Sequence, residues 1–395
     1  MKNVLAAFDK FKGSLTAQEA CEIATKAILA TEPTANVISA PLTDGGEGFC
    51  KILTDAAKGK LIEVRTLDAR FSEKPAHFGI VELDELPSGA RKCLQIPEEA
   101  RKIAVVEMAQ ASDLVSLPDN LRNPWEASSA GTGMLLREAA NLEVDAILLG
   151  IGGSATNDIG LGALEALGAE FIDKEGVPIA RIAPKDFDRL EEIDLISNLL
   201  PMPPILIACD VENPLLGEQG ATKVFAPQKG LPENEHAPME EALSQASILL
   251  CQASEKDSDA LNLPGAGAAG GIGLGLHLVY GAVFLPGFEL VSQWLNLDHF
   301  IRQVDLLLTG EGRFDQSSLL GKGPWALIQA GAKAGKQIHV HAGSVAHDIR
   351  AALPQNAIAK SITPENTLLE QAFIKAPDFL YQSILNTFLS PADKD

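Results

Sequence analysis

Three absences narrow the class of protein that this sequence encodes. The five cysteines, at positions 21, 50, 93, 209 and 251, are scattered and contain no Cys-x-x-Cys pair. This argues against a disulfide framework or a zinc site and predicts reduced thiols in a cytoplasmic protein. The histidines show no H-x-x-x-H spacing. No apolar run is long enough to span a bilayer, and no signal peptide is expected, so we predict no membrane association.

Basic residues are scarce as well. The chain of 395 residues has 32 Lys and Arg against 53 Asp and Glu, a formal net charge of −21. This balance disfavours binding to nucleic acid, whose phosphates require a positive surface. An acidic protein that handles anions needs a locally positive pocket instead. We therefore expect a small-molecule substrate and no nucleic-acid partner. We also expect the protein to be a monomer or a small homo-oligomer.

Length and hydrophobic pattern together predict an α/β protein with two domains. A strand at 4–8, a helix at 16–30 and a strand at 37–40 begin a βα alternation that resumes after residue 130. Between them, strand-like segments without intervening helices predict a mixed sheet: 61–67, 77–83, 92–96 and 103–108. We expect a Rossmann-like parallel-sheet domain from residues 1–68 and 286–395, with a mixed α/β domain, 69–285, inserted in it.

The most informative segment is 150–158, which follows the apolar run 146–149 and precedes a helical stretch. Its glycines let backbone N–H groups approach an anion, and the helix start adds a positive dipole end. Gly150, Gly152 and Ala155 also satisfy the dinucleotide fingerprint G-x-G-x-x-G/A, with Glu170 where a ribose-binding acid is expected. An NAD(P)-dependent hydroxy-acid dehydrogenase is therefore one hypothesis.

A second glycine-rich segment, 264–271, shows how readily that fingerprint arises in a glycine-rich chain. Gly265, Gly267 and Gly270 fit it, although no strand precedes them. Phosphate binding and a loop packed closely against a helix start are equally good interpretations. Lys229, in the turn 227–230, is expected to be exposed.

Four further loops carry charged residues, and each has a functional and a structural interpretation. In segment 8–15, Lys12 could bind a phosphate or carboxylate and Asp9 a hydroxyl; alternatively Ser14 or Thr16 caps the next helix. In segment 43–48, Asp44 and Glu47 suit Mg2+ or a hydroxyl, or else form a capping box.

The other two loops follow later strands. Asp210 is placed as a metal ligand or general base, or forms an Asx turn before Pro214. In segment 309–315, Arg313 offers bidentate contact to a carboxylate or phosphate, while Glu311 and Asp315 offer metal or hydroxyl contacts. A structural Arg–Asp pair is the alternative there.

Taken together, these segments resemble, in order and approximate spacing, the bacterial type-1 glycerate kinase family. The resemblance rests on segments 9–15, 43–48, 150–158, 209–215, 227–230, 264–271 and 309–315. It implies phosphorylation of D-glycerate by ATP with Mg2+, to the 2-phospho product, by direct in-line transfer. It also implies two α/β domains, one inserted in the other, with the active site in the cleft between them.

The resemblance leads to a set of expected site residues. We expect catalytic roles for Lys12, Asp44, Asp210 and Arg313, and substrate contacts from Asp9, Ser14, Glu47, Glu311 and Asp315. ATP phosphates are expected at Gly150, Gly152, Gly153, Ser154, Asn157, Gly265, Gly267 and Gly270. Mg2+ is expected at Asp44, Asp210 and Asp315, and Asp158 is as well explained by a helix cap as by catalysis.

Some positions depart from the family pattern. Lys10 replaces a serine of the first loop, and Ser317 stands where glutamine is expected. Ala130 stands where tyrosine is frequent, and Glu212 replaces an aspartate. Lys10 and Ser317 leave room for a related hydroxy acid as substrate. They also motivate a third hypothesis, a non-catalytic hydroxy-acid-binding sensor on the same fold.

Overall fold

The structure, a computed structural model, describes residues 2–320 and 323–389. The chain forms two compact units. The first contains Met1–Asp44 and Val291–Asp395, and the second is the intervening segment Gly45–Leu290. The second unit is therefore inserted into the sequence of the first.

The first unit is built on a parallel sheet of five strands. Their order is β15 (Ala357–Ser361), β13 (Gln337–Ala342), β11 (Leu306–Thr309), β1 (Asn3–Ala6) and β2 (Asn36–Ser39). Every neighbouring pair is parallel, so the carboxyl ends of all five strands lie at one edge. The central strand β11 is fully buried, as expected for a sheet covered on both faces.

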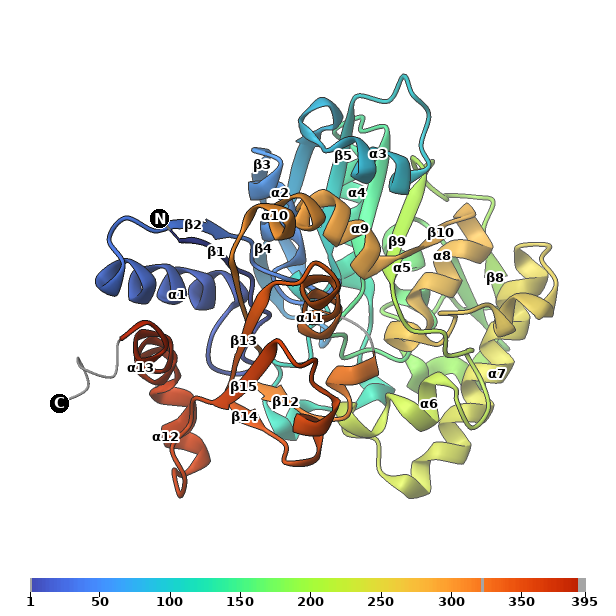
Figure 1. Cartoon of the computed structure of the whole chain (residues 1–395). Coiled ribbons are helices and arrows are strands. Elements are labelled where there is room, and N and C mark those ends of the chain that lie inside the picture. The colour runs from blue at the N-terminus through green and yellow to red at the C-terminus, as the bar shows by residue number, and fades with distance from the viewer. Residues whose placement is uncertain (1, 321–322, 390–395) are drawn as a thin grey trace. The chain divides into compact units, whose positions relative to one another are not determined.

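Helix α1 (Ala17–Thr31) begins where its sequence provides a capping box. Thr16 accepts from the Glu19 amide, and the Glu19 carboxylate accepts from the Thr16 amide. Its buried face is mostly alanine and packs against α13 (Ala376–Phe388), near the other end of the chain. Figure 1 shows these two helices in blue and red. The remaining helices of this part are α10 (Leu297–Gln303), α11 (Pro324–Lys333) and α12 (Leu369–Ile374).

The second unit contains a mixed sheet of six strands. Their order is β10 (Val283–Pro286), β9 (Ile205–Cys209), β6 (Ala146–Gly150), β5 (Lys102–Glu107), β4 (Glu73–Glu82) and β3 (Lys60–Leu67). The first four strands are mutually parallel, whereas β4 is antiparallel to both of its neighbours. The mixed sheet that the sequence predicts is thus confirmed.

Helices and two small sheets complete the description. The helices of the second unit are α2 (Phe49–Ala56), α3 (Ser88–Leu94), α4 (Ala130–Ala140), α5 (Leu161–Ala166), α6 (Ala221–Val224), α7 (His236–Ala253) and α8 (Ile272–Tyr280). Helix α9 (Gly287–Trp294) carries the chain back to the first unit. Strands β7 (Glu170–Asp173) and β8 (Leu190–Asp194) form an antiparallel pair, and β12 (Arg313–Phe314) and β14 (Ser344–Val345) a parallel pair in the first unit.

Segment 92–96, expected to be a strand, instead lies largely in helix α3. That prediction is wrong because a short run of mixed apolar and charged residues fits both the helical and the strand period. Helix α2 and strand β3 belong to the second unit, so the compact units differ from the division at residues 68 and 286. Strand β3 pairs along its whole length with β4, and this pairing holds it in the second unit.

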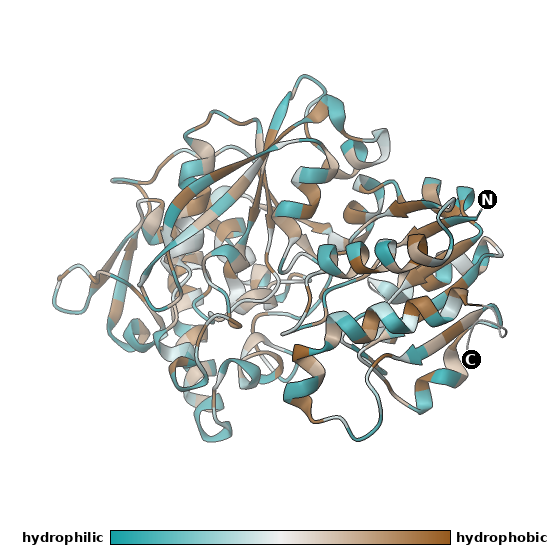
Figure 2. Ribbon diagram, turned by 90° about the vertical axis from the view of Figure 1, so that its left-hand side faces the viewer, coloured by the Kyte–Doolittle hydropathy of each residue, from teal (hydrophilic) through white to brown (hydrophobic). Residues whose placement is uncertain are grey.

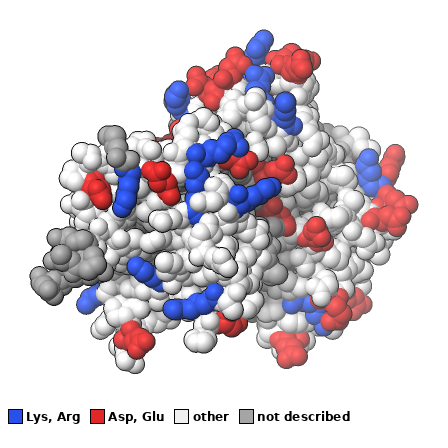
Figure 3. Space-filling view, viewed as in Figure 1, with Lys and Arg blue, Asp and Glu red and all other residues white. Residues whose placement is uncertain are grey.

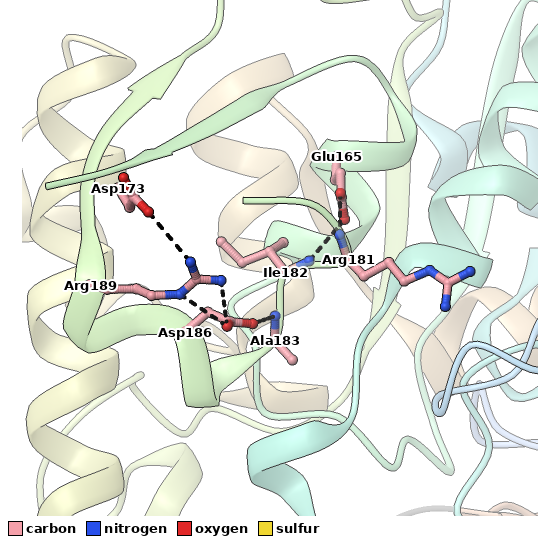
Figure 4. A network of polar contacts seen from close by, with 7 residues as sticks. All are labelled: Glu165, Asp173, Arg181, Ile182, Ala183, Asp186 and Arg189. Carbon is pink, nitrogen blue, oxygen red and sulfur yellow. Dashed lines mark hydrogen bonds and ion pairs between the residues drawn. The ribbon is translucent and has the colours of Figure 1, made fainter. Parts of the chain in front are cut away.

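A polar network secures the segment that follows α5 (Figure 4). The two oxygens of Glu165 accept the amides of Arg181 and Ile182 at 2.6 and 3.1 Å. The Arg189 guanidinium pairs with Asp186 at 3.0 Å. Glu165 thus binds backbone amides and holds the C-terminal end of α5, the helix that starts beside Asp158.

Hydrophobic residues gather on the strands and on one side of the helices (Figure 2). The first unit has a core cluster that includes Val4, Leu308 and Leu380, and the second has a larger one around β5, β6 and β9. Among residues 2–320 and 323–389, no helix combines the length and the apolar character that crossing a bilayer requires.

The packing of α13 gives a stability prediction. Leu380 is fully buried, so Leu380→Ala should lower the free energy of unfolding by about 2–5 kcal/mol through lost burial and a residual cavity. Leu369 on α12 is 70% exposed, and Leu369→Ala should change it by less than about 0.5 kcal/mol. Urea unfolding of both variants measures the difference, and equal effects would contradict the packing of α13.

Candidate functional site

Charged side chains gather in the first unit where β1, β2 and β11 end. The Lys10 ammonium lies 3.0 Å from Asp44 Oδ1 and 3.6 Å from Asp9 Oδ1. The Asp9 amide donates to the carbonyl of Gly310, which joins the loop after β1 to the loop after β11. Burial raises the pKa of Asp9 to about 6; Lys10 lowers it and Asp44 raises it further. The parallel sheet therefore brings Asp9 and Asp44 together at its carboxyl edge, where α/β sheets bind ligands.

Glu311 adds a third carboxylate to this cluster. Its Oε1 is buried and has no hydrogen-bond partner among the described residues. Burial raises the pKa of Glu311 to about 7, and the nearby charges of Asp9 and Asp315 raise it as well. A half-buried carboxyl group with a pKa near 7 can exchange a proton at neutral pH.

Arg313 and Asp315 form the structural pair that was the alternative interpretation of their loop. Arg313 Nε lies 2.8 Å from Asp315 Oδ2, and the arginine side chain is 77% exposed. The Ser317 hydroxyl donates to Asp315 at 2.6 Å, and this bond, more than Arg313, lowers the pKa of Asp315. Ser317, a departure from the family pattern, thus stabilises the charged form of Asp315.

Three other predicted residues of these loops are held differently. Lys12 and Glu47 are exposed. The Ser14 hydroxyl donates to the Phe11 carbonyl at 3.0 Å, so it supports its own turn. Lys10, which the sequence marks only as a departure from the family pattern, is the cation that the structure places between Asp9 and Asp44.

In the second unit, two glycine-rich segments touch backbone to backbone. The Gly152 amide donates to the carbonyl of Gly45 at 2.9 Å. A Cβ on Gly152 would lie 2.6 Å from the Cα of Gly46, so only glycine fits there. One of the amides predicted to hold phosphate is therefore already used inside the protein, while Gly153 is exposed at the tip of the turn.

The glycines of segment 264–271 serve a similar purpose. The Gly267 amide donates to the Asn213 carbonyl at 2.9 Å, in the loop after β9. The Gly270 carbonyl accepts from the Ile159 amide at 2.8 Å, in the loop after β6. A Cβ on Gly270 would lie 2.1 Å from the carbonyl oxygen of Thr156. This segment thus joins the loops that follow the two strands.

Asp158 is the anchor of the loop after β6. Its carboxylate accepts four hydrogen bonds, from the amide and hydroxyl of Ser129 and the amides of Gly160 and Gly162. Burial raises its pKa, and these four bonds oppose the rise. The cap interpretation therefore accounts for Asp158. The adjacent Ile159 has a φ of 56°, a strained value for a β-branched residue.

Asp210 holds the start of α9. Its Oδ2 accepts the amide of Phe288 at 2.9 Å. A carboxylate at a helix N-terminus is favourable without any ligand. The amide of Phe288 is thus an observed partner of Asp210 and supports a structural role for this carboxylate.

Glu107, at the end of β5, is a residue that sequence reasoning missed. Its two oxygens accept the amides of Gly48 and Cys50 at 3.2 and 2.9 Å and so cap α2. The capping box of Asp44 and Glu47, which was the alternative interpretation of their loop, does not start α2, because α2 starts at Phe49 with Gly48 as its N-cap. Burial raises the pKa of Glu107 to about 7 against these bonds. The position of this glutamate, at the end of a buried strand, was the available signal.

The expectation for Lys229 is wrong. Its side chain is 2% exposed, whereas a lysine in a turn is expected to face solvent. Its ammonium donates to the Thr156 carbonyl at 2.7 Å. The sequence offers no signal for this burial, because the contact joins residues 73 positions apart.

The donor set bears on the expected Mg2+ site. Within the described part of the chain, no group of three or more His, Cys, Asp or Glu side chains is arranged to hold a metal ion. Mg2+ in nucleotide-dependent enzymes is usually held by one or two carboxylates together with phosphate oxygens. Asp44, with a 48% exposed side chain, fits that smaller requirement, whereas Asp315 is already engaged by Arg313 and Ser317.

The dehydrogenase hypothesis does not agree with the topology. Glu170 lies on β7, which forms a two-stranded sheet with β8, separate from the six-stranded sheet. A ribose-binding acid should follow the next parallel strand of the same sheet.

On the face shown in Figure 3, basic and acidic side chains are interspersed.

Glycine-rich and acidic loops at the carboxyl ends of parallel strands are the arrangement of an α/β enzyme. A model of the glycerate kinase family matches residues 4–389. Glycerate kinase of Halalkalibacterium halodurans is 35% identical over 98% of this chain and 97% of its own length. Glycerate 2-kinase of Escherichia coli is 36% identical over 88% of this chain and 87% of its own.

A solved structure agrees with these relatives. The crystal structure of a protein proposed to be glycerate kinase 2 from Salmonella typhimurium LT2 superposes with a TM-score of 0.75. It is 32% identical and covers 98% of this chain and 97% of its own. The chain belongs to the glycerate kinase family, and the resemblance that its loops indicate is confirmed.

The burial of Glu107 gives a pH prediction. Its folded pKa of about 7 lies above the ordinary value of 4.5, so the stability it contributes is present at low pH and lost as the pH rises through 7. The unfolding free energy of the wild type minus that of Glu107→Gln should therefore fall by roughly 3 kcal/mol between about pH 4 and pH 8. Urea unfolding at several pH values measures it. Glu63→Gln, on an exposed side chain of β3, is the control, and a pH-independent difference for Glu107→Gln would show that burial does not raise the pKa of Glu107.

Proposed function

We propose that this protein transfers the terminal phosphoryl group of ATP to D-glycerate, producing 2-phosphoglycerate in the cytoplasm. Family membership carries the class of reaction, and the names of the relatives support glycerate as the substrate. The observation that carries the proposal is the cluster of Asp9, Lys10, Asp44 and Glu311 at the carboxyl ends of three parallel strands. It combines carboxylates suited to the glycerate hydroxyls with Lys10, a cation that pairs with Asp9 and Asp44.

In this proposal, the first unit binds glycerate. Arg313, exposed and next to the cluster in sequence, and Lys12 are the exposed cations suited to a carboxylate or to the transferring phosphoryl group. Asp9 and Asp44 accept hydrogen bonds from the glycerate hydroxyls. Ser14, Glu47 and Asp315 remain predicted substrate contacts.

The transfer itself needs no covalent intermediate. The 2-hydroxyl oxygen attacks the terminal phosphorus, the bond to the bridging oxygen breaks, and ADP leaves. Glu311 is suited to accept the hydroxyl proton, because its Oε1 has no partner among the described residues and its pKa is raised to about 7. Bound Mg2+ would neutralise phosphate charge, and Asp44 is the carboxylate proposed to hold it.

The glycine-rich loops of the second unit are proposed to bind ATP. Gly153 and Ser154 form the tip of the turn after β6, and Gly265 belongs to the segment joined to it. Gly150, Gly152, Gly267 and Gly270 contribute by letting these loops pack closely. Asp210 is proposed to act by holding the start of α9.

An ADP-release assay with D-glycerate, followed by identification of the product, tests the function. We expect glycerate-dependent ADP release and 2-phosphoglycerate. Release of 3-phosphoglycerate would correct the regiochemistry alone. Binding of glycerate without ADP release would favour the sensor hypothesis, which Lys10 and Ser317 motivate.

Two variants test the glycerate-binding cluster. Asp44→Asn and Arg313→Ala should each lower kcat/KM for glycerate roughly 10²-fold or more, because a charged contact to the reacting groups is lost. Asp55→Asn and Arg65→Ala, which change exposed residues of α2 and β3, serve as matched controls. Full turnover by both site variants, with unchanged circular dichroism, would reject the site assignment.

A further inference from the structure

Lys229 enters the interior from an exposed turn. Its neighbours Gln228 and Gly230 are exposed, while its own side chain is 2% exposed. The ammonium group has three N–H donors, and with the described residues it makes one hydrogen bond, to the Thr156 carbonyl. Within the part of the chain that the structure describes, no carboxylate lies within 4.0 Å of it. A buried ammonium needs more partners than this.

The residues beside that carbonyl have unused polar atoms too. Thr156 Oγ1, Asn157 Nδ2 and Asn157 Oδ1 are all buried and have no hydrogen-bond partner in the described structure. Both residues have no solvent exposure. Native interiors rarely leave such groups unpaired, so a concentration of them in two consecutive residues indicates a missing bound group.

Asp158 attracts the Lys229 ammonium electrostatically but does not form an ion pair with it within 4.0 Å. Its two oxygens already accept four hydrogen bonds from Ser129, Gly160 and Gly162. It acts on Lys229 through space and raises the pKa of the lysine, while burial lowers that pKa to about 7. The missing group should therefore be an anion, which would restore the charge of the ammonium.

Three of these unpaired groups match a phosphate in type, whereas Asn157 Oδ1 is an acceptor and needs a different partner. An ammonium N–H, a hydroxyl and an amide NH2 are donors, and phosphate offers several acceptor oxygens. The Gly152 and Gly267 amides, by contrast, are already bonded to Gly45 and Asn213. These two backbone amides are therefore not available for a phosphate, and side chains must supply part of the phosphate binding that the glycine-rich segments suggest.

We propose that Lys229, Thr156 and Asn157 form a binding site for a phosphate group of the nucleotide. This inference rests on the proposed function for its source of phosphate, although free inorganic phosphate has the same chemistry. The loop Ala268–Gly271 borders the site, since Gly270 packs directly on the backbone of Thr156 and Asn157.

Titration calorimetry with ATP and, separately, with inorganic phosphate tests the site. Measurements at about pH 8 in two buffers of different ionisation enthalpy report the protons taken up on binding. Lys229 is mostly neutral at that pH, so an arriving anion should cause proton uptake by the wild-type protein. Uptake with ATP alone would identify the nucleotide as the source, and uptake with both would include free phosphate.

Three variants make the result specific. Lys229→Met should abolish the uptake and weaken ATP binding at least about ten-fold, because a charge-assisted hydrogen bond is lost. Thr156→Val keeps the lysine, and should weaken binding while the uptake remains. Lys223→Met changes an exposed lysine of α6 and should behave like the wild type. Circular dichroism and melting curves establish that each variant is folded.

Two outcomes would overturn the proposal. One is unchanged affinity and unchanged proton uptake in Lys229→Met, which would assign the unpaired atoms to internal water. The other is a wild-type protein that binds neither ATP nor phosphate. Glycerate turnover is a separate readout: ATP binding with proton uptake but no turnover would reject the proposed function and leave this site standing.

Discussion

The second unit depends on direct backbone contact between loops that carry no side chain at the contact points. Gly45 and Gly46 lie against Gly152, and Gly270 lies against the backbone of Thr156. Any Cβ on Gly152 or Gly270 would overlap main-chain atoms of the neighbouring loop. Because the loops approach so closely, their amides and carbonyls bond to one another, and the ends of β6 and β9 are held in a fixed relation.

Buried carboxylates also hold these loops, by accepting hydrogen bonds from backbone amides. Asp158 collects four donors from two helix starts, and Glu107 caps α2 from the end of β5. Each carboxylate opposes its own desolvation with amides that would otherwise be unpaired at a helix terminus. Lys229 differs, since its hydrogen bond and the field of Asp158 leave its burial incompletely compensated. Uncompensated burial of this kind is typical of binding sites.

The first unit contains a cluster of carboxylates with one lysine, Lys10, among them. Burial raises the pKa of both Asp9 and Glu311; the charge of Asp44 raises that of Asp9 further, and the charge of Asp9 raises that of Glu311. Lys10 lies within 3.6 Å of Asp9 and 3.0 Å of Asp44 and offsets part of that repulsion. Its replacement of a serine in the family pattern therefore changes the charge of the cluster, and we expect it to influence which hydroxy acid binds.

The sequence alone determined what depends on local pattern: the βα alternation and the placement of charged and glycine-rich loops after buried strands. It left the cap of α1 open between Ser14 and Thr16, and the structure shows Thr16. Spacing of those loops also indicated the family. Only the tertiary structure decided that Gly152 and Gly267 use their amides internally and that Lys229 is buried. The physical reason is sequence separation. These outcomes are set by contacts between residues tens of positions apart, such as Lys229 with Thr156, which no local period encodes.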